Sequence, residues 1–276
     1  MNKVIIIPVY NQLDFVQKCI ESVIKYTDDL KLIVVDDAST DFETTKWLKE
    51  NANSLKYDFI YHDKSQGFSK TANDGIDYAV DHYRFNCLCV LNSDTEIITE
   101  GWFEKVEQDM VAENNVGIAG VLSNNAESQS VEEQHYLCNM EKRPTVECPL
   151  IHGFCLFLST NLLKKVKHYN HETFPNYASD YDFCLNSIKA GFKNILVGRV
   201  FVRHFGKKSG ITDDMKLVKD TLAKKWPNLN KCLFLSVKST HQYKCLIRTD
   251  QNGINSVDRF KKRKMFTRLG TGGIVP

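Results

Sequence analysis

Acidic side chains follow two apolar runs of the chain at the points where those runs end. Asp36 and Asp37 come directly after the run at 32–35, and Asp94 follows the run at 87–91. Short runs of this kind, bounded by polar residues, are typical of buried parallel strands. Because ligands of open α/β sheets bind at the carboxyl ends of such strands, Asp36 and Asp37 are predicted to lie at a ligand site.

The elements that would position these residues alternate between strands and helices. Strand-like runs occupy 4–9, 31–35, 59–61, 87–91, 116–121, 154–158 and 195–202, and helical spacing is seen at 13–25, 44–51, 69–81, 102–113 and 179–190. This alternation predicts a parallel sheet with helices on both faces.

Three short motifs in this frame resemble those of the family 2 inverting glycosyltransferases of GT-A fold. They are Pro8-Val9-Tyr10-Asn11, the acidic segment 36–41, and Asn92-Ser93-Asp94. The resemblance, which covers about residues 3–210, implies an α/β fold with a Rossmann-like, mostly parallel central sheet. It also implies transfer of a sugar from a nucleotide-sugar donor to an acceptor hydroxyl. The domains expected from it are a catalytic domain at 1–225, with a donor half at 1–121 and an acceptor half at 122–225, and a C-terminal extension at 226–276.

The donor site implied by the resemblance centres on the two acids after the second strand. Asp37 is expected to accept a hydrogen bond from N3 of uracil or thymine, and Asp36 to support ribose or metal. Gly67 would let the backbone approach the donor. The alternative for 36–39 is a turn and helix cap without a ligand. The donor-binding set is Pro8, Tyr10, Asn11, Asp36, Asp37, Gly67, Asn73, Asn92, Ser93 and Asp94.

Mn²⁺ or Mg²⁺ is the cofactor that the resemblance implies. Asn92-Ser93-Asp94 stands at the D-x-D position, whose acids hold the cation against the two phosphates. Asn92 keeps an oxygen ligand but removes one negative charge. Asp94 is the primary predicted ligand and His204 the second, with a turn at 92–94 and a structural histidine as the alternatives.

The segment at 179–185 resembles the part of the family that carries the catalytic base, with Ser179 where the first Glu usually stands. Asp180 matches the base. Residues two apart on a helix differ by about 200° in direction, so Asp180 and Asp182 cannot both face a cleft. The alternative is that both only stabilise a helix N-terminus. The acceptor-site set is Trp102, His152, Gly153 and Asp182, and core packing is the alternative for the aromatic member.

Composition sets the broad class of the protein. The chain has 276 residues, 42% hydrophobic and 25% charged, which suits one large α/β core or two small ones. Nine scattered cysteines, without a CxxC pair or a secretory leader, predict reduced, buried thiols in a cytoplasmic protein. The apolar runs fall short of the ~18 residues that cross a bilayer.

A basic cluster distinguishes the tail at 259–269. Residues 259–268 carry six positive charges beside apolar residues that would share a helical face. A solvated tail is the favoured interpretation, and peripheral contact with the inner face of a membrane is the other. The expected partners are a nucleotide-sugar donor and a glycan or lipid-linked glycan acceptor. Nucleic acid is not expected, because the rest of the chain is slightly acidic.

Two other enzyme classes with similar sheets lack their signatures here. A nicotinamide oxidoreductase needs G-x-G-x-x-G after the first strand, and a sugar nucleotidylyltransferase needs a Gly-rich basic loop, where this chain has Tyr10-Asn11-Gln12. A non-catalytic nucleotide-sugar or carbohydrate-binding module stays an alternative, because Asn92 and Ser179 depart from the family pattern. UDP is the default donor nucleotide. dTDP stays open, because thymine presents the same hydrogen-bonding edge as uracil.

Overall fold

The structure is a computed structural model that describes residues 2–52, 57–126, 129–133, 143–206, 214–230 and 232. Strands and helices alternate through the first half as the sequence predicts. The strands are β1 (Lys3–Val9), β2 (Leu30–Asp36), β3 (Asp58–Tyr61), β4 (Cys87–Leu91), β5 (Thr95–Ile97), β6 (Val116–Leu122), β7 (Thr145–Glu147), β8 (Cys155–Ser159) and β9 (Lys193–His204). The helices are α1 (Leu13–Tyr26), α2 (Phe42–Ala52), α3 (Phe68–His82), α4 (Trp102–Ala112), α6 (Thr160–Val166), α7 (Ser179–Lys189) and α8 (Met215–Lys225).

The strands form one sheet in the order β3-β2-β1-β4-β8-β6-β9-β5, with β7 paired to β9 beside this path. β1 to β4 are parallel, and Val9 is paired with Asp36, so β1 and β2 end at the same edge. The predicted parallel arrangement is therefore confirmed for the first half. β8 is antiparallel to β4 and β6, because it starts at the edge where β4 ends, with Cys155 opposite Leu91.

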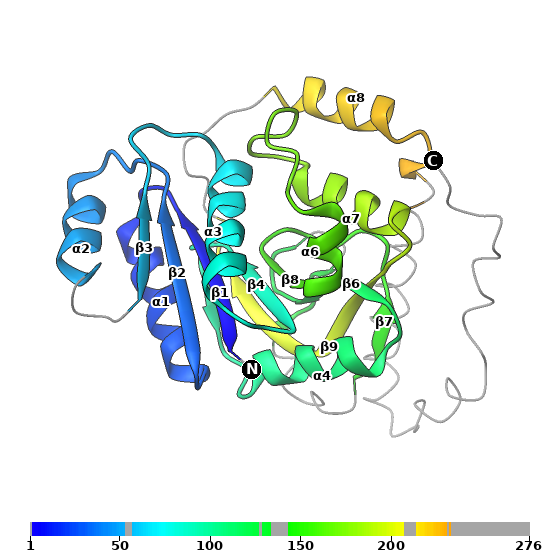
Figure 1. Ribbon diagram of the computed structural model, residues 1–276, viewed down its shortest axis with the longest axis horizontal. Coiled ribbons are helices and arrows are strands. Elements are labelled where there is room, and N and C mark those ends of the chain that lie inside the picture. The colour runs from blue at the N-terminus through cyan, green and yellow to red at the C-terminus, as the bar shows by residue number, and fades with distance from the viewer. Residues whose placement is uncertain are drawn as a thin grey trace.

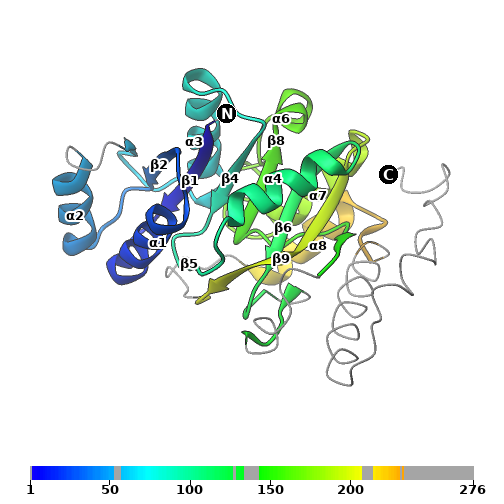
Figure 2. The same cartoon turned by 90° about the horizontal axis from the view of Figure 1, so that it is seen from below.

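Alternating side chains of the central strands fill two apolar layers, one on each face of the sheet. Ile5 and Ile7 of β1 pack with α1 and α4 on one face. Val4 and Ile6 pack with α3, α6 and α7 on the other. Figures 1 and 2 show these helices on both sides of the sheet. Since both faces are covered, every position of such a strand is apolar, which is why its sequence is a continuous apolar run.

The sequence does not predict β5, β7, α6 and α8. β5 and β7 have three residues each, too few for a periodic pattern. α8 begins after Asp214, whose carboxylate accepts hydrogen bonds from the N–H groups of Lys216 and Leu217. In the view of Figure 1, α8 crosses the top of the molecule above α7. No helix in the described ranges is long and apolar enough to cross a bilayer.

The packed body continues past the predicted domain boundary between residues 225 and 226. Trp226, Leu229 and Cys232 are buried in the same apolar layer as the side chains of α7. The predicted extension at 226–276 therefore begins with residues of the main core. The basic tail at 259–269 lies outside the described residues.

Seven of the nine cysteines lie in the described ranges, and all seven are buried free thiols, as the sequence predicts. Cys138 and Cys245 lie outside those ranges. Burial raises the pKa of Cys19 to about 12, which keeps this thiol protonated and unreactive at neutral pH.

Candidate active site

Asp37, at the carboxyl end of β2, is fully engaged by the protein itself. Its Oδ1 accepts a hydrogen bond from the Gln66 N–H at 2.8 Å and lies 2.9 Å from His62 Nδ1. Its Oδ2 accepts from the Ser65 hydroxyl at 2.7 Å and the Gly67 N–H at 3.0 Å. Burial raises the pKa of Asp37, but these bonds outweigh it and hold the pKa below its usual value. A carboxylate has about four acceptor positions, and these donors fill them, so Asp37 has little capacity left for the predicted contact with the donor base.

Asp36 has far fewer partners than its neighbour. Its Oδ1 accepts from the Ser39 N–H at 3.1 Å. Burial raises the pKa of Asp36, and its hydrogen bonds with Ser39 only partly oppose this rise. A carboxylate that is 6% exposed and has so few donors retains acceptor capacity for a ligand N–H or hydroxyl.

Asn11 braces the loop at 38–41 beside Asp36. Its Oδ1 accepts from the N–H groups of residues 40 and 41 at 2.8 and 2.9 Å. Pro8 is buried within β1, and Tyr10 is half-buried just after it. Asn11 thus fixes the conformation of the loop at 38–41 and does so without contacting Asp36 itself through these bonds.

Several residues near this edge of the sheet have a positive φ, as do Asp29, Asn115 and Lys167 elsewhere in the described chain. Asn11, Gln12 and Ala38 have φ of 58°, 67° and 57°, and Ala178, just before α7, has φ of 64°. Positive φ is costly for residues other than glycine and is concentrated at functional sites. The loops after β1 and β2 and the start of α7 are therefore candidates for ligand contact.

Gly67 and Asn73, both predicted to contact the donor, instead tie the two halves of the protein together. Gly67 has φ of +85°, and a Cβ there would lie 2.8 Å from Asn176 Oδ1, so the close approach is to the segment before α7. Asn73 Oδ1 accepts from the Tyr169 N–H at 2.9 Å, and its Nδ2 donates to the Tyr169 carbonyl at 2.9 Å. Both polar atoms of the Asn73 side chain thus bond within the protein, and the approach of the Gly67 backbone to a donor stays a prediction.

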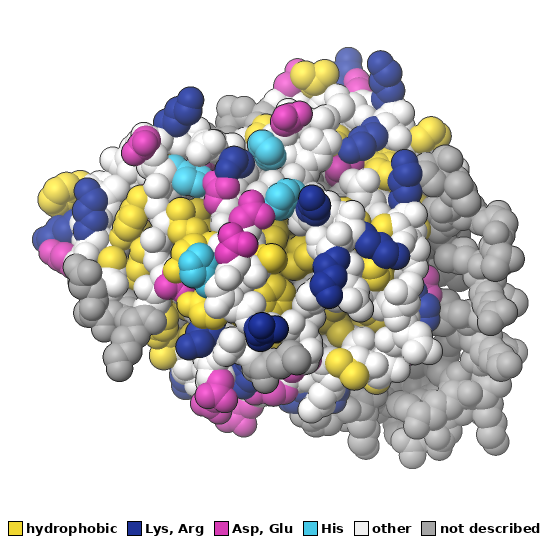
Figure 3. Space-filling view, in the orientation of Figure 1, with side chains coloured by type: hydrophobic (Ala, Val, Ile, Leu, Met, Phe, Trp, Pro, Cys, Tyr) yellow, Lys and Arg dark blue, Asp and Glu magenta, His cyan; other side chains and the backbone are white. Residues whose placement is uncertain are grey.

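His62, which the sequence reasoning missed, joins Asp37 to α3. Its Nδ1 lies 2.9 Å from Asp37 Oδ1, and its Nε2 lies 3.0 Å from Asp74 Oδ2. Acidic and histidine side chains gather over α3 in Figure 3. The two partners of His62 lie 25 and 12 residues away along the chain, so no local sequence pattern identifies this histidine.

Asp94 and His204 meet just beyond the carboxyl end of β4. β5 pairs antiparallel with β9, which places Thr95 opposite His204, and Ser93 is half-buried beside them. His204 Nε2 lies 3.4 Å from Asp94 Oδ1, and its Nδ1 lies 2.6 Å from the Asn125 carbonyl oxygen. Because a carbonyl only accepts, Nδ1 carries a hydrogen, and in the neutral ring the Nε2 lone pair faces Asp94. The sequence prediction that these two residues belong together agrees with this geometry.

This donor set fits a hard divalent cation. Two ligands about 2.1 Å from one ion and at right angles lie about 3 Å apart, close to the 3.4 Å between Asp94 and His204. Asn92 Oδ1 is buried and has no hydrogen-bond partner among the described residues. Within those residues no group of three His, Cys, Asp or Glu side chains converges on one point. The remaining ligands would therefore come from Asn92 and from the phosphates of a donor.

Asp180 lies in the first turn of α7 and faces the loop before β8. Its Oδ2 accepts from the Gly153 N–H at 2.8 Å, and its Oδ1 accepts from the Tyr181 N–H at 2.8 Å. Burial raises the pKa of Asp180, opposed by nearby His152 and by these backbone hydrogen bonds. A general base works best when its pKa is close to the working pH, so a raised pKa suits that role.

Gln129, a second residue that sequence reasoning missed, fixes the loop beside Asp180. This buried side chain accepts a hydrogen bond from the His152 N–H and donates one to a carbonyl of β6 at 3.0 Å. The His152 ring packs edge-on against Tyr181, with centroids 5.8 Å apart. His152 and Gly153 thus lie next to Asp180.

Trp102 and Asp182, predicted to contact the acceptor, lie in the core instead. Trp102 is 0% exposed, and its indole N–H donates to the Thr27 hydroxyl at 2.9 Å. It cannot stack on a sugar, so the core alternative is correct. Asp182 is also 0% exposed and accepts from the Trp226 indole N–H at 2.7 Å. Its predicted acceptor contact is therefore wrong, and it anchors the end of α8 to α7.

The Asp94–His204 pair and Asp180 lie near the same edge of the sheet, joined by the loop before β8. The Asn92 N–H donates to the Phe154 carbonyl at 2.9 Å, and the Phe154 ring stacks on His204 with centroids 5.2 Å apart. The residue before Phe154 is the one that binds Asp180. Adjacent strands are about 4.8 Å apart, so the end of β2, two strands from β4, lies roughly 10 Å from Asn92.

The fold of the protein is the GT-A glycosyltransferase fold, because its sheet and helices superpose on solved glycosyltransferases. GalNAc-T7, solved with UDP, GalNAc and Mn²⁺, superposes with a TM-score of 0.64 at 12% identity, over 83% of this chain and 50% of that chain. A mannosyltransferase from Pyrobaculum calidifontis, PcManGT, solved with GDP-Man and Mn²⁺, superposes with a TM-score of 0.58 at 13% identity, over 94% and 78%. TarS of S. aureus gives 0.56 at 17% identity, over 74% and 36%. At these identities the likeness concerns the fold alone.

The sequence comparison gives the family. The family described as glycosyl transferase family 2 matches residues 4–169, more than half of the chain, and the protein belongs to this family. The uncharacterized protein y4gI of Sinorhizobium fredii (strain NBRC 101917 / NGR234) is 23% identical over 215 residues, which is 69% of this chain and 23% of that protein. The chain thus spans about a quarter of the length of this curated relative and half of GalNAc-T7.

Proposed function

We propose that the protein is an inverting glycosyltransferase that moves a sugar from a nucleoside diphosphate sugar to a hydroxyl of a glycan or glycolipid. The observation that carries the proposal is the position of Asp180, a half-buried carboxylate with a raised pKa, beside the loop that packs on the Asp94–His204 pair. Membership of glycosyl transferase family 2 supports it. UDP is the expected nucleotide and dTDP the second. The GDP-Man complex of PcManGT is a reason to test GDP as well.

Asp36 takes the role in donor binding that the sequence assigned to Asp37. Its carboxylate is held by Ser39 and has acceptor capacity to spare. An N–H of a pyrimidine base or a ribose hydroxyl would satisfy a buried carboxylate at this point. Asn11 keeps the loop at 38–41 in the shape that presents Asp36.

Asp94, His204 and the side-chain oxygen Oδ1 of Asn92 would hold Mn²⁺ or Mg²⁺. When bound, such an ion neutralises the charge that develops on the departing nucleoside diphosphate. Asp94 and the side-chain oxygen of Asn92 would supply oxygen ligands, and the hydrogen bond from Nδ1 to the Asn125 carbonyl would hold Nε2 of His204 toward the same ion.

Asp180 is the base for the acceptor. It takes the proton of the acceptor hydroxyl while the hydroxyl oxygen forms a bond to the anomeric carbon of the donor sugar. The bond between that carbon and the diphosphate oxygen breaks, and the electron pair leaves with the nucleoside diphosphate. Because attack and departure occur on opposite sides, the configuration inverts. The Gly153 N–H orients the carboxylate, and the loop at 152–153 is the proposed acceptor-side wall.

A nucleotide-sugar-binding module without turnover is the second candidate. Asn92 in place of the first metal-binding acid and Ser179 in place of the usual Glu favour it. Both functions share the donor site and differ in whether Asp180 acts on a hydroxyl.

Release of nucleoside diphosphate from UDP-, dTDP- and GDP-sugars distinguishes the two candidates. Each donor is incubated with the protein in Mn²⁺, in Mg²⁺ and in EDTA, with water as the acceptor. The enzyme is expected to release nucleoside diphosphate from one donor class only when the metal is present. Binding of a nucleotide without any release would favour the module and contradict the proposed activity.

A further inference from the structure

Asp182 is a buried carboxylate that the proposed chemistry does not use. Its Oδ1 accepts from the Trp226 indole N–H at 2.7 Å and lies 2.8 Å from Lys225 Nζ. Its Oδ2 accepts from Lys225 at 3.0 Å and from the Asn186 amide at 3.1 Å. A buried carboxylate costs free energy unless donors and an opposite charge surround it, and an apolar side chain would fill the same space without that cost. The pairing therefore points to a role beyond packing.

The first turn of α7 is the part of the helix that this pairing holds. α7 begins after Ala178, and no side chain of its N-cap residue bonds the free N–H groups of the first turn. Asp180 is tied to the Gly153 N–H, and Asp182, about 200° around the helix, is tied to the end of α8. The turn that carries the proposed base thus lies between two ties on nearly opposite sides.

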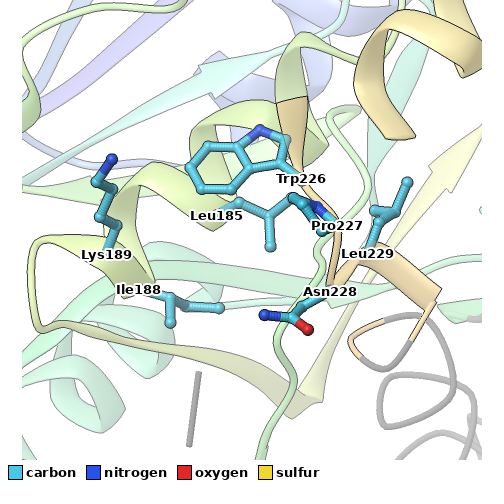
Figure 4. A pocket seen from close by; sticks show the side chains of 7 residues that line it. All are labelled: Leu185, Ile188, Lys189, Trp226, Pro227, Asn228 and Leu229. Carbon is cyan, nitrogen blue, oxygen red and sulfur yellow. The ribbon is translucent and has the colours of Figure 1, made fainter. Parts of the chain in front are cut away.

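Trp226 is also seated on α7 by its ring. A small hollow between α7 and the segment after α8 is lined by Leu185, Ile188 and Lys189 on one side and by residues 226–229 on the other, as Figure 4 shows. The ammonium groups of Lys225 and Lys189 lie 5.7 and 5.9 Å from the centre of the Trp226 ring. Apolar contact and cation–π attraction thus keep the indole N–H in position for Asp182.

We propose that Asp182, Lys225 and Trp226 form a clamp, the α7 clamp, that positions Asp180 for proton abstraction. By tying Asp182 to the end of α8, the clamp fixes the orientation of the first turn of α7, and with it the place of the Asp180 carboxylate. The proposal rests on the role of Asp180 proposed above. It gives the residues at the end of α8, which lie beyond the family match at 4–169, a part in the reaction.

The expected effect of the clamp falls on turnover and not on donor binding. A displacement of about 1 Å at a reacting group lowers rates by roughly 10²-fold, so a loosened first turn is expected to lower kcat by about tenfold. The donor side is built on the ends of β1, β2 and β4, which the clamp does not touch. Nucleotide affinity should therefore stay within about twofold of wild type.

Trp226→Phe is the main test variant, because it keeps an aromatic ring and removes only the indole N–H. Asp182→Asn keeps an oxygen for the indole but removes the charge that pairs with Lys225. Trp102→Phe is the matched control, since it removes the same kind of buried indole hydrogen bond, here to Thr27, in the core beside α4. Three quantities are measured on the full chain: hydrogen exchange of amides 182–185, kcat for nucleoside diphosphate release, and the Kd of the nucleotide.

Trp226→Phe is expected to speed exchange in the first turn of α7 and to lower kcat about tenfold at an unchanged Kd, whereas Trp102→Phe changes none of the three. Unchanged exchange in Trp226→Phe would contradict the clamp. Faster exchange with an unchanged kcat, or an equal fall of kcat in Trp102→Phe, would contradict the positioning role. A wild type that releases no nucleoside diphosphate from any donor would overturn the proposed function, while faster exchange in Trp226→Phe alone would still support the clamp as the device that orders this turn.

Discussion

The two acidic pairs of the site, Asp36 with Asp37 and Asp180 with Asp182, divide their tasks in the same way. In each pair one carboxylate is saturated by the chain's own donors, Asp37 by a loop and Asp182 by the end of α8. The other carboxylate has few donors and, because it is buried, a raised pKa. The comparison teaches that the role of an acid is set by the donors around it. In the proposed function the saturated member holds the site together, and its neighbour is left for the ligand.

Loss of the base is the largest expected effect. Asp180→Asn keeps the size of the side chain but removes the proton acceptor, so nucleoside diphosphate release is expected to fall by about 10³-fold, within the range for general bases. Asp182→Asn should lower the rate only about tenfold, because Asp182 positions Asp180 and does not itself take the proton. Steady-state rates check this difference, with nucleotide affinity as the control. Equal losses in the two variants would remove the distinction between them.

For stability, unlike for the rate, the saturated acid should have the larger effect: substitution of Asp37 should destabilise the protein more than substitution of Asp36. Asp37→Asn replaces one carboxylate oxygen, which accepts two hydrogen bonds, with an NH₂ group that cannot accept them. The free energy of unfolding is therefore expected to fall by about 2–4 kcal/mol. Asp36→Asn removes a poorly compensated buried charge and should change that free energy by less than about 1 kcal/mol. Urea denaturation of both variants at pH 7 measures the difference. A similar loss in both would show that the two carboxylates are equally structural.

The pH dependence of the rate sharpens the comparison further. The active form of Asp180 is ionised, and its raised pKa places the acid limb of the pH–rate profile above the range of an exposed aspartate. The same raised pKa means that the fold binds this proton more tightly than the unfolded chain does. The contribution of Asp180 to stability is therefore present in acid and is lost as pH rises from the usual aspartate pKa through the raised one. The profile of kcat/KM between pH 3 and pH 8 checks the limb, and a limb at or below the usual aspartate pKa would contradict the assignment.

The pH dependence of the stability contribution has the opposite sign for Asp37. Its lowered pKa gives stability that is present at neutral pH and is lost only as pH falls through that lowered value.

The smallest expected effect comes from the loop that faces the base. A Cβ at Gly153 would lie 3.0 Å from Asp180 Cβ and 3.1 Å from its Oδ2. Gly153→Ala should therefore displace the carboxylate by a few tenths of an ångström and lower kcat by up to about tenfold. An unchanged kcat in Gly153→Ala would show that the hydrogen bond from the Gly153 N–H does not place Asp180.

The fold was predictable where both faces of a strand are covered. β1, β2, β4 and β6 are continuous apolar runs, because α-helices pack on both sides of them. β5 and β7 are too short to show a pattern. The direction of β8 depends on the loop before it, which returns the chain to the edge where β4 ends.

The site was predictable in its positions and only partly in its roles. Asp36, Asp94 and Asp180 follow apolar strands or open a helix, so local sequence marks them. Whether a neighbouring acid is saturated depends on partners far along the chain, such as Gly67 for Asp37 and Trp226 for Asp182, 30 and 44 residues away. Such contacts are set by the tertiary fold, which no local spacing reports.

The thermal unfolding midpoint of wild type and Asp94→Ala, measured with UDP, dTDP and GDP in the presence and absence of Mn²⁺, tests the central claim most directly. A ligand that binds only the folded protein raises the midpoint. The account predicts that one nucleotide raises the midpoint of wild type when Mn²⁺ is present, and that this rise is lost in Asp94→Ala. No rise with any nucleotide, or an equal rise in Asp94→Ala, would contradict a donor site built on Asp36, Asp94 and His204.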